Sequence, residues 1–297
     1  AVEIARLCQG RKDRSYKGTN TIIFKHPDAL PKGRKATYLR VVADYRPNKE
    51  DPYRIRWTVG GNRVDYDGVR YTPNADLTTA KILFNSVIST RKGKFMGIDI
   101  KDFYLNTPLA RYEYMWVPES MLPQEIIDEY NLRPLIQNGR ILAEIQKSMY
   151  GLPQAGRVSY DALLPHLEAG GYYATQFTPG LFRYKSKPIT FCLVVDDFGV
   201  KYTNKQDVDD LIQHLASKYT VTTDWEGKTY CGVNLDWNYE NRTVALSIPG
   251  YVTKALRRFF HKHPTAPQHS PHPWTPPRYG SKKQIAANTN KIPLTPK

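Results

Sequence analysis

Apolar and polar residues alternate in two neighbouring segments of the chain, 36–47 and 51–61. This period of two is typical of β-strands with one buried face, and the Pro- and Asn-containing stretch between the segments favours a turn. The two segments therefore predict a β-hairpin. Because successive side chains of a strand point to opposite faces, Arg54 and Arg56 lie on the same face of this hairpin.

Four other segments have apolar residues at the spacing of an amphipathic helix: 76–90, 122–132, 159–172 and 207–219. Asp76 begins the first of them and predicts an N-cap, since its carboxylate can accept a hydrogen bond from the first-turn N–H groups. Asp207, Asp209 and Asp210 lie in the first turn of the last one, where the helix dipole favours negative charge. We interpret these three residues as helix-start charges rather than as a metal site.

The β-branched and aromatic stretch FCLVVDDFGV, residues 191–200, contains two adjacent carboxylates, Asp196 and Asp197. Acidic residues between two apolar runs are typical of a hairpin turn. They are also typical of a divalent-metal site, and the stretch alone leaves both interpretations open. A second short apolar strand runs directly into Asp99, and segment 230–248 predicts two further strands around a turn.

Basic residues are concentrated at the two ends of the chain. Residues 1–40 contain ten Lys and Arg against three acidic residues, and residues 254–297 contain nine against none. Eight prolines fall between 264 and 297, where hydrophobic periodicity is lost. We therefore predict a basic N-terminal extension over 1–35 and a basic, proline-rich, disordered tail over 261–297. Charge alone does not distinguish a phosphate-binding tail from one without a partner.

The whole chain of 297 residues has a formal net charge of +15, which predicts a polyanionic partner. Its three widely spaced cysteines argue against a disulfide framework and against a zinc cluster built on thiolates. The four histidines from His261 onward lack the folded scaffold that a metal site needs. Without a long apolar run or a signal peptide, we expect an intracellular protein with no membrane partner, in a cytoplasmic particle or the nucleus.

The positions of the charged residues suit phosphoryl transfer. Two Mg²⁺ ions about 3.5–4 Å apart require hard oxygen ligands, so carboxylates from different strands must converge. Asp99 at a strand end and Asp196 and Asp197 at a hairpin tip can provide these ligands. A bound triphosphate also requires cations that do not titrate, which Arg54 and Arg56 can provide.

Several motifs, in the same order along the chain, resemble those of the reverse transcriptases of copia-type LTR retrotransposons. GIDIKDFYLNTPL resembles that family's first polymerase motif, and VVDDFGV resembles its Asp-Asp hairpin. YRIRWTVGG is similar to a basic segment of the fingers, and KSMYGLPQAGRVSY to a Ser-Leu-Tyr-Gly-Leu-x-Gln element. YMWVP and TYCGVNLDW are similar to two further blocks. The resemblance extends over about residues 36–260.

The resemblance implies a metal site. Asp99 and Asp196 would be its primary ligands, with Asp197 as a weaker third carboxylate. The backbone carbonyl of Ile100 would bind the metal on the nucleotide side. The expected cofactor is a pair of Mg²⁺ ions, with Mn²⁺ as an alternative ion.

The resemblance also implies a nucleotide site. Tyr104 would lie under the nucleotide sugar and exclude a 2′-hydroxyl, and Gln154 would lie against the nucleotide or the template. Arg56, with Arg54, would bind the triphosphate. Without the motif context, Tyr104 is a core tyrosine and Arg56 a surface arginine.

The fold implied by the resemblance is an α+β right-hand polymerase over 36–260, whose palm contains an antiparallel sheet. Its fingers would comprise 36–95 and 107–160, and its thumb would be rudimentary. The implied reaction is RNA-directed DNA synthesis, with deoxynucleoside triphosphates and an RNA or DNA template with a primer as partners. The polyprotein neighbours of such enzymes, integrase and RNase H, have no counterpart in this sequence.

Three positions depart from the family pattern. Val194 replaces an aromatic residue, usually Tyr, and Gly156 and Ser159 replace a proline and a tryptophan. These departures leave open a remnant that binds nucleic acid without catalysis. A metal-dependent nuclease would also use clustered carboxylates, but it offers no reason for the positions of Tyr104 and Gln154.

Overall fold

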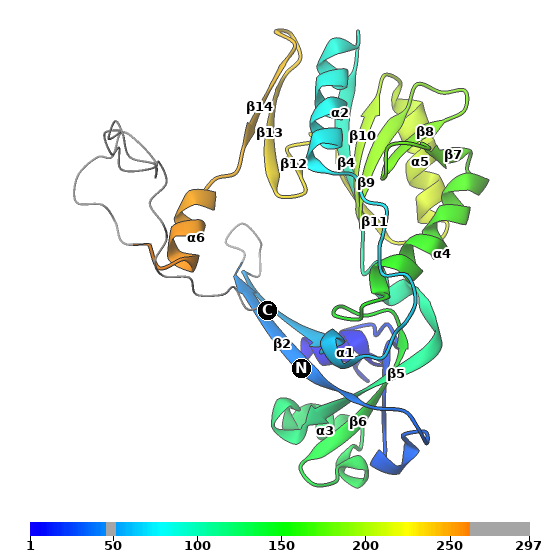
Figure 1. The fold of residues 1–297 in the computed structure, drawn as a ribbon, viewed down its shortest axis with the longest axis vertical. Helices are drawn as coiled ribbons and strands as arrows, with labels where there is room; N and C mark the ends of the chain where they lie inside the picture. The colour runs from blue at the N-terminus through cyan, green and yellow to red at the C-terminus, as the bar shows by residue number, and fades with distance from the viewer. Residues whose placement is uncertain (46–51, 262–297) are drawn as a thin grey trace, which may run out of the picture. The chain divides into compact units, whose positions relative to one another are not determined.

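The computed structural model describes residues 1–45 and 52–261 (Figure 1). The chain divides into two units, Ala1–Ile248 and Pro249–Lys297, each of which is described here by itself. The first unit is a mixed α/β structure that contains three β-sheets.

The first sheet has five strands in the order β1-β6-β5-β2-β3. Their bounds are Ile22–Lys25 for β1, Thr37–Tyr45 for β2, Tyr53–Val59 for β3, Pro108–Pro118 for β5 and Arg140–Lys147 for β6. The hairpin predicted from the alternating pattern is confirmed, since β2 and β3 pair antiparallel with Val42 opposite Arg56 and Asp44 opposite Arg54. Strand β3 is therefore an edge of this sheet.

The second sheet has six strands in the order β11-β4-β10-β9-β8-β7. Their bounds are Lys94–Ile100 for β4, Tyr172–Ala174 for β7, Leu181–Tyr184 for β8, Thr190–Val194 for β9, Asp197–Tyr202 for β10 and Val221–Asp224 for β11. A third sheet is formed by β12 (Thr229–Tyr230), β13 (Val233–Asn238) and β14 (Thr243–Ser247), so the two strands predicted in 230–248 are confirmed.

The four predicted helices are present as α2 (Leu77–Ser89), α3 (Gln124–Glu129), α4 (Ala155–Ala169) and α5 (Lys205–Ala216). Asp76 is the N-cap of α2, and its carboxylate accepts a hydrogen bond of 2.7 Å from the Thr79 N–H. Helix α4 begins at Ala155, four residues before the start predicted at Ser159. The residue before it, Gln154, makes no side-chain cap hydrogen bond, so no capping signal in the sequence marks this start. The described residues of this unit also form five short 3₁₀ helices: Pro27–Ala29, Gly61–Arg63, Tyr104–Asn106, Glu119–Met121 and Arg133–Leu135.

The two faces of the six-stranded sheet are covered by different elements (Figure 1). On one face, Ile98 of β4 and Leu193 of β9 pack in one buried cluster with residues of α4 and α5. On the other face, Phe95 and Cys192 pack with residues of α2, β12 and β13. Alternate residues of the same strands thus enter two different cores, which explains why these strands are apolar along their whole length.

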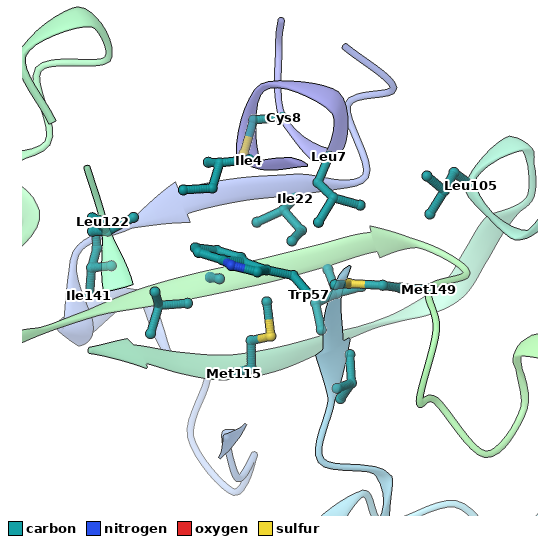
Figure 2. Close-up of a cluster of buried hydrophobic side chains, with 14 of the residues drawn as sticks. Ile4, Leu7, Cys8, Ile22, Trp57, Leu105, Met115, Leu122, Ile141 and Met149 are labelled. Atoms are coloured by element: carbon teal, nitrogen blue, oxygen red, sulfur yellow. The ribbon is translucent and has the colours of Figure 1, made fainter. Parts of the chain in front are cut away.

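The N-terminal segment is part of the first core. Its charge predicts only a basic extension, but it contains helix α1 (Val2–Leu7) and strand β1, which pairs with β6. Figure 2 shows Ile4 and Leu7 of α1 beside Ile22 and Trp57 in this cluster. Both elements are too short for a periodic pattern to reveal them.

The second unit contains α6 (Tyr251–Arg258), none of whose residues is buried. Most of the predicted disordered tail, including three of its four histidines, lies outside the described residues. The three cysteines are free, as the sequence predicts. In the part of the chain that the structure describes, no helix has both the length and the apolar character needed to cross a membrane.

Candidate active site

The strand pairing of the second sheet brings the predicted carboxylates together. Asp99, near the end of β4, lies directly opposite Asp197, the first residue of β10. The Ile100 N–H donates a hydrogen bond of 3.1 Å to the Asp196 carbonyl. A strand end and a hairpin tip are thus adjacent, as the order of the motifs predicts.

The turn between β9 and β10 consists of Val195 and Asp196. Val195 has a φ of +60°, a region in which a β-branched residue is rare and strained. Its N–H donates to the Asn74 side chain at 3.0 Å, which helps to hold this conformation. The hairpin interpretation of the two aspartates is therefore confirmed, and the strained turn presents both of them at the end of the sheet.

Negative charge is concentrated at this tip. Burial, together with the charges of Asp197 and Asp99, raises the pKa of Asp196 to about 6. Burial and the charge of Asp99 also raise the pKa of Asp197. Both carboxylates thus lie in surroundings that disfavour their ionised form, which is the environment that a bound cation would relieve.

The donor atoms at the tip suit a hard divalent cation. Three carboxylates lie on neighbouring residues, and the backbone of Ile100 lies beside them, since its N–H binds the Asp196 carbonyl. Among the described residues, however, no three His, Cys, Asp or Glu side chains are gathered closely enough to hold a metal ion. The ligand types and the backbone positions fit Mg²⁺, and the mutually repelling side chains would have to close around it.

Six of the eight predicted site residues line one cleft of about 1320 Å³: Arg54, Arg56, Asp99, Ile100, Asp196 and Asp197. The cleft joins the edge of the five-stranded sheet to the tip of the β9–β10 hairpin. It therefore places guanidinium groups and carboxylates around the same space, although they are far apart in the sequence.

Tyr150 supports the arginine side of the cleft. The Arg56 guanidinium lies 4.8 Å from the centre of the Tyr150 ring, a cation–π distance. Tyr150 is also part of the cleft lining. Tyr150 belongs to the motif KSMYGLPQAG, from which the resemblance implies a role for Gln154 but none for Tyr150.

Tyr104 and Gln154 do not line this cleft. Tyr104 is half-buried, and its ring centre lies 5.4 Å from that of Tyr150. Its pKa is raised by burial and then by the charge of Asp196, so it lies near the carboxylates. Gln154 is only 3% exposed and donates a hydrogen bond of 3.3 Å to Glu113. The structure thus keeps Tyr104 close to the site and places Gln154 within the protein interior.

The departures from the family pattern also lie close to these elements. Val194 is paired with Asp197 across the β9–β10 hairpin. Ser159 is buried in α4, and its hydroxyl has no hydrogen-bond partner. A Cβ atom at Gly156 would lie 2.8 Å from the Thr72 hydroxyl, so a larger residue there would displace Thr72.

Comparison with known protein families identifies the family to which the chain is similar. The family model described as "Reverse transcriptase (RNA-dependent DNA polymerase)" matches residues 28–265, which is more than half of the chain. The match includes every predicted site residue and leaves out α1 and β1.

Proposed function

Because this chain belongs to the reverse transcriptase family typical of copia-type LTR retrotransposons, whose members are RNA-directed DNA polymerases, we propose that it adds deoxynucleotides to a primer 3′-hydroxyl at the carboxylate cleft. The observation that supports this most strongly is the register of the second sheet. Asp99 and Asp197 face each other there, beside Asp196 and within a cleft that also contains Arg54 and Arg56.

In this proposal the three aspartates and the Ile100 carbonyl would hold two Mg²⁺ ions. When bound, such ions lower the pKa of an attacking hydroxyl and neutralise charge on the triphosphate and the leaving pyrophosphate. The carboxylates would serve as ligands that position the metal ions. They must be ionised to do so, and their raised pKa values mean that protons compete with metal binding in mildly acidic solution.

The arginines bind the incoming triphosphate in this proposal. Arg56 is held in place by its stacking on Tyr150, so its guanidinium loses little freedom when it contacts a phosphate. Arg54 lies two residues away on the same face of β3 and adds a second permanent positive charge. Both groups also line the cleft from the side of the five-stranded sheet.

The architecture suits the right-hand description of polymerases. We assign the six-stranded sheet with α2, α4 and α5 to the palm, since it bears the carboxylates. The five-stranded sheet then corresponds to the fingers, since it bears the arginines. The template–primer duplex would be bound through phosphates and 2′-hydroxyls rather than base edges, which gives little sequence preference.

Primer extension on an RNA template with Mg²⁺ tests the proposal. The wild type should extend the primer, whereas Asp99→Asn and Asp196→Asn should reduce extension by at least about a thousandfold, since each removes a metal ligand without changing side-chain volume. Asp236→Asn, on the exposed surface of β13, is the matched control and should extend normally.

Nucleic-acid binding is measured in parallel. A wild type that binds the template–primer without extending it would contradict the proposal and indicate a binding remnant. Near-normal extension by either active-site variant would show that the metal site lies elsewhere.

A further inference from the structure

The N-terminal segment 1–27 lies outside the family match, yet Glu3 and Arg6 of α1 line the same cleft as the carboxylates. Arg6 is 7% exposed, which is unusual for a charged residue unless its charge is paired. Its Nε and one terminal nitrogen donate to the Glu3 carboxylate at 2.9 and 3.0 Å. Its other terminal nitrogen donates to Asp102.

The two partners of Arg6 connect it to both sides of the cleft. Asp102 belongs to the turn that follows β4, three residues after Asp99, and has a φ of +54°. On the other side, Glu3 accepts a hydrogen bond of 3.1 Å from the backbone N–H of Trp57. Trp57 follows Arg56 directly in the edge strand β3.

The outer edge of β3 is also held at a second point. The Val59 N–H donates a hydrogen bond of 2.8 Å to the carbonyl of Tyr150, the residue on whose ring Arg56 lies. On its outer side, an edge strand presents N–H groups that neighbouring segments can bind. Here Glu3 of α1 binds the Trp57 N–H, and the Tyr150 carbonyl binds the Val59 N–H. The position of Arg56 therefore depends on both hydrogen bonds.

We infer that Arg6, with Glu3, is a positioning residue that couples the arginine-bearing strand β3 to the turn after the Asp99 strand. This inference rests on the proposed polymerase function, because it assigns the coupling to the alignment of triphosphate-binding and metal-binding groups. Groups that act together on one substrate must be held within about 0.5 Å of the productive geometry. An ion-pair bridge between the two sides supplies that constraint.

The test compares the full-length variants Arg6→Met and Asp102→Asn with the control Arg11→Met. Asn tolerates the positive φ of position 102, so this variant removes the charge without straining the turn. Arg11 lies in the same N-terminal segment and also contacts two carboxylates, Glu125 and Glu129, but it does not line the cleft.

In steady-state primer extension, Arg6→Met and Asp102→Asn should each raise the KM for the incoming nucleotide about tenfold or more, and Arg6→Lys should recover part of the loss. Arg11→Met should leave this KM within about twofold of the wild-type value, even if its Tm falls equally. A purely structural role for Arg6 predicts that the KM changes no more than in Arg11→Met at the same loss of Tm. That result would overturn the inference.

Amide hydrogen exchange provides a readout that does not depend on activity. Arg6→Met should speed exchange at the Trp57 amide and in residues 101–106, whereas Arg11→Met should leave both unchanged. Unchanged protection at Trp57 and in the turn would overturn the inference. If the wild type did not extend primers, the proposed function would fail, and the exchange result would still decide whether the coupling exists.

Discussion

Asp196 combines two unfavourable conditions for a carboxylate, since it is largely buried and lies beside two other aspartates. Its pKa of about 6 lies above the ordinary value of 3.8, so ionisation costs the folded protein stability. The sign follows from proton linkage. Between pH 4 and pH 6 the Asp196 carboxyl is protonated more fully in the folded chain than in the unfolded chain, so the contribution of this group to stability falls as the pH rises through this range.

Asp196→Asn should therefore raise the Tm in metal-free buffer at pH 7.5 and should leave it nearly unchanged at pH 4. Allowing for solvent screening, we expect the free energy of unfolding of this variant to exceed that of the wild type by roughly 1–2 kcal/mol at pH 7.5. Added Mg²⁺ should stabilise the wild type and not the variant. Thermal unfolding at both pH values measures this, with Asp236→Asn as the control. A lower Tm for Asp196→Asn at pH 7.5 would contradict our account of the tip.

Tyr104 tests the nucleotide site at the position where a core role is the strongest alternative. If its ring excludes a 2′-hydroxyl, Tyr104→Val should allow ribonucleotide incorporation with little loss of stability. A core tyrosine instead predicts a cavity that costs on the order of 3 kcal/mol and leaves sugar preference unchanged. The ratio of deoxyribonucleotide to ribonucleotide incorporation, measured together with the Tm, separates these outcomes.

Tyr160→Val is a suitable control for this experiment. Tyr160 is a buried tyrosine of α4 that does not line the cleft, so its truncation should lower the Tm without altering sugar preference. If the Tyr104 variant behaves like the Tyr160 variant, the role of Tyr104 is that of a core residue and not of a sugar-excluding one.

At the scale of elements, α4 and α5 are joined by a pair of stacked histidines. The rings of His166 and His214 lie 4.2 Å apart and nearly parallel, and each Nε2 lies within hydrogen-bond distance of the other residue's carbonyl oxygen, at 2.9 and 2.6 Å. Burial lowers the pKa of His166, and the neighbouring charges of His214 and Lys218 lower it further. The folded protein therefore favours the neutral form of the His166 ring.

Since the pKa of His166 is lower in the folded than in the unfolded state, the unfolded chain binds a proton first as the pH falls. The contribution of His166 to stability should accordingly decrease as the pH falls below about 6.5. His166→Gln should make the Tm less dependent on pH between 5 and 7, and the exposed His261→Gln should not. Equal slopes for the wild type and His166→Gln in thermal unfolding would show that the pKa of His166 does not change on unfolding.

At the scale of the whole molecule, the dominant feature is the net charge of +15. A nucleic acid bound through its phosphates releases counterions, so affinity depends on salt. A cleft that contacts about six phosphates predicts a loss of affinity on the order of a thousandfold between 50 and 200 mM salt. Fluorescence anisotropy with a labelled RNA–DNA hybrid measures this slope.

Deletion of 264–297 shows how much of that slope belongs to the tail. This segment contains basic and no acidic residues, so its removal should make the slope shallower if it contacts phosphate. A slope unchanged by the deletion would assign the salt dependence to the rest of the chain. A weak slope in the intact chain would contradict binding through phosphates.

Elements whose signals are local can be predicted from the order of residues alone. The alternation around Arg54 and Arg56 predicted the β2–β3 hairpin, and Asp76 predicted the start of α2, because strand and helix periods and caps act within a few residues. The apolar runs around Asp99, Asp196 and Asp197 predicted strands that end in carboxylates. These predictions require no contact between distant parts of the chain.

Contacts between residues that are distant in the sequence depend instead on how the sheets and helices pack. Asp99 faces Asp197 because β4 and β10 pair in one register, and Arg6 reaches Asp102 because α1 packs on the edge of β3. Gln154 shares its motif with Tyr150, yet it is buried while Tyr150 lines the cleft. Such placements depend on the packing of whole sheets and helices, and no pattern within a single segment contains that information.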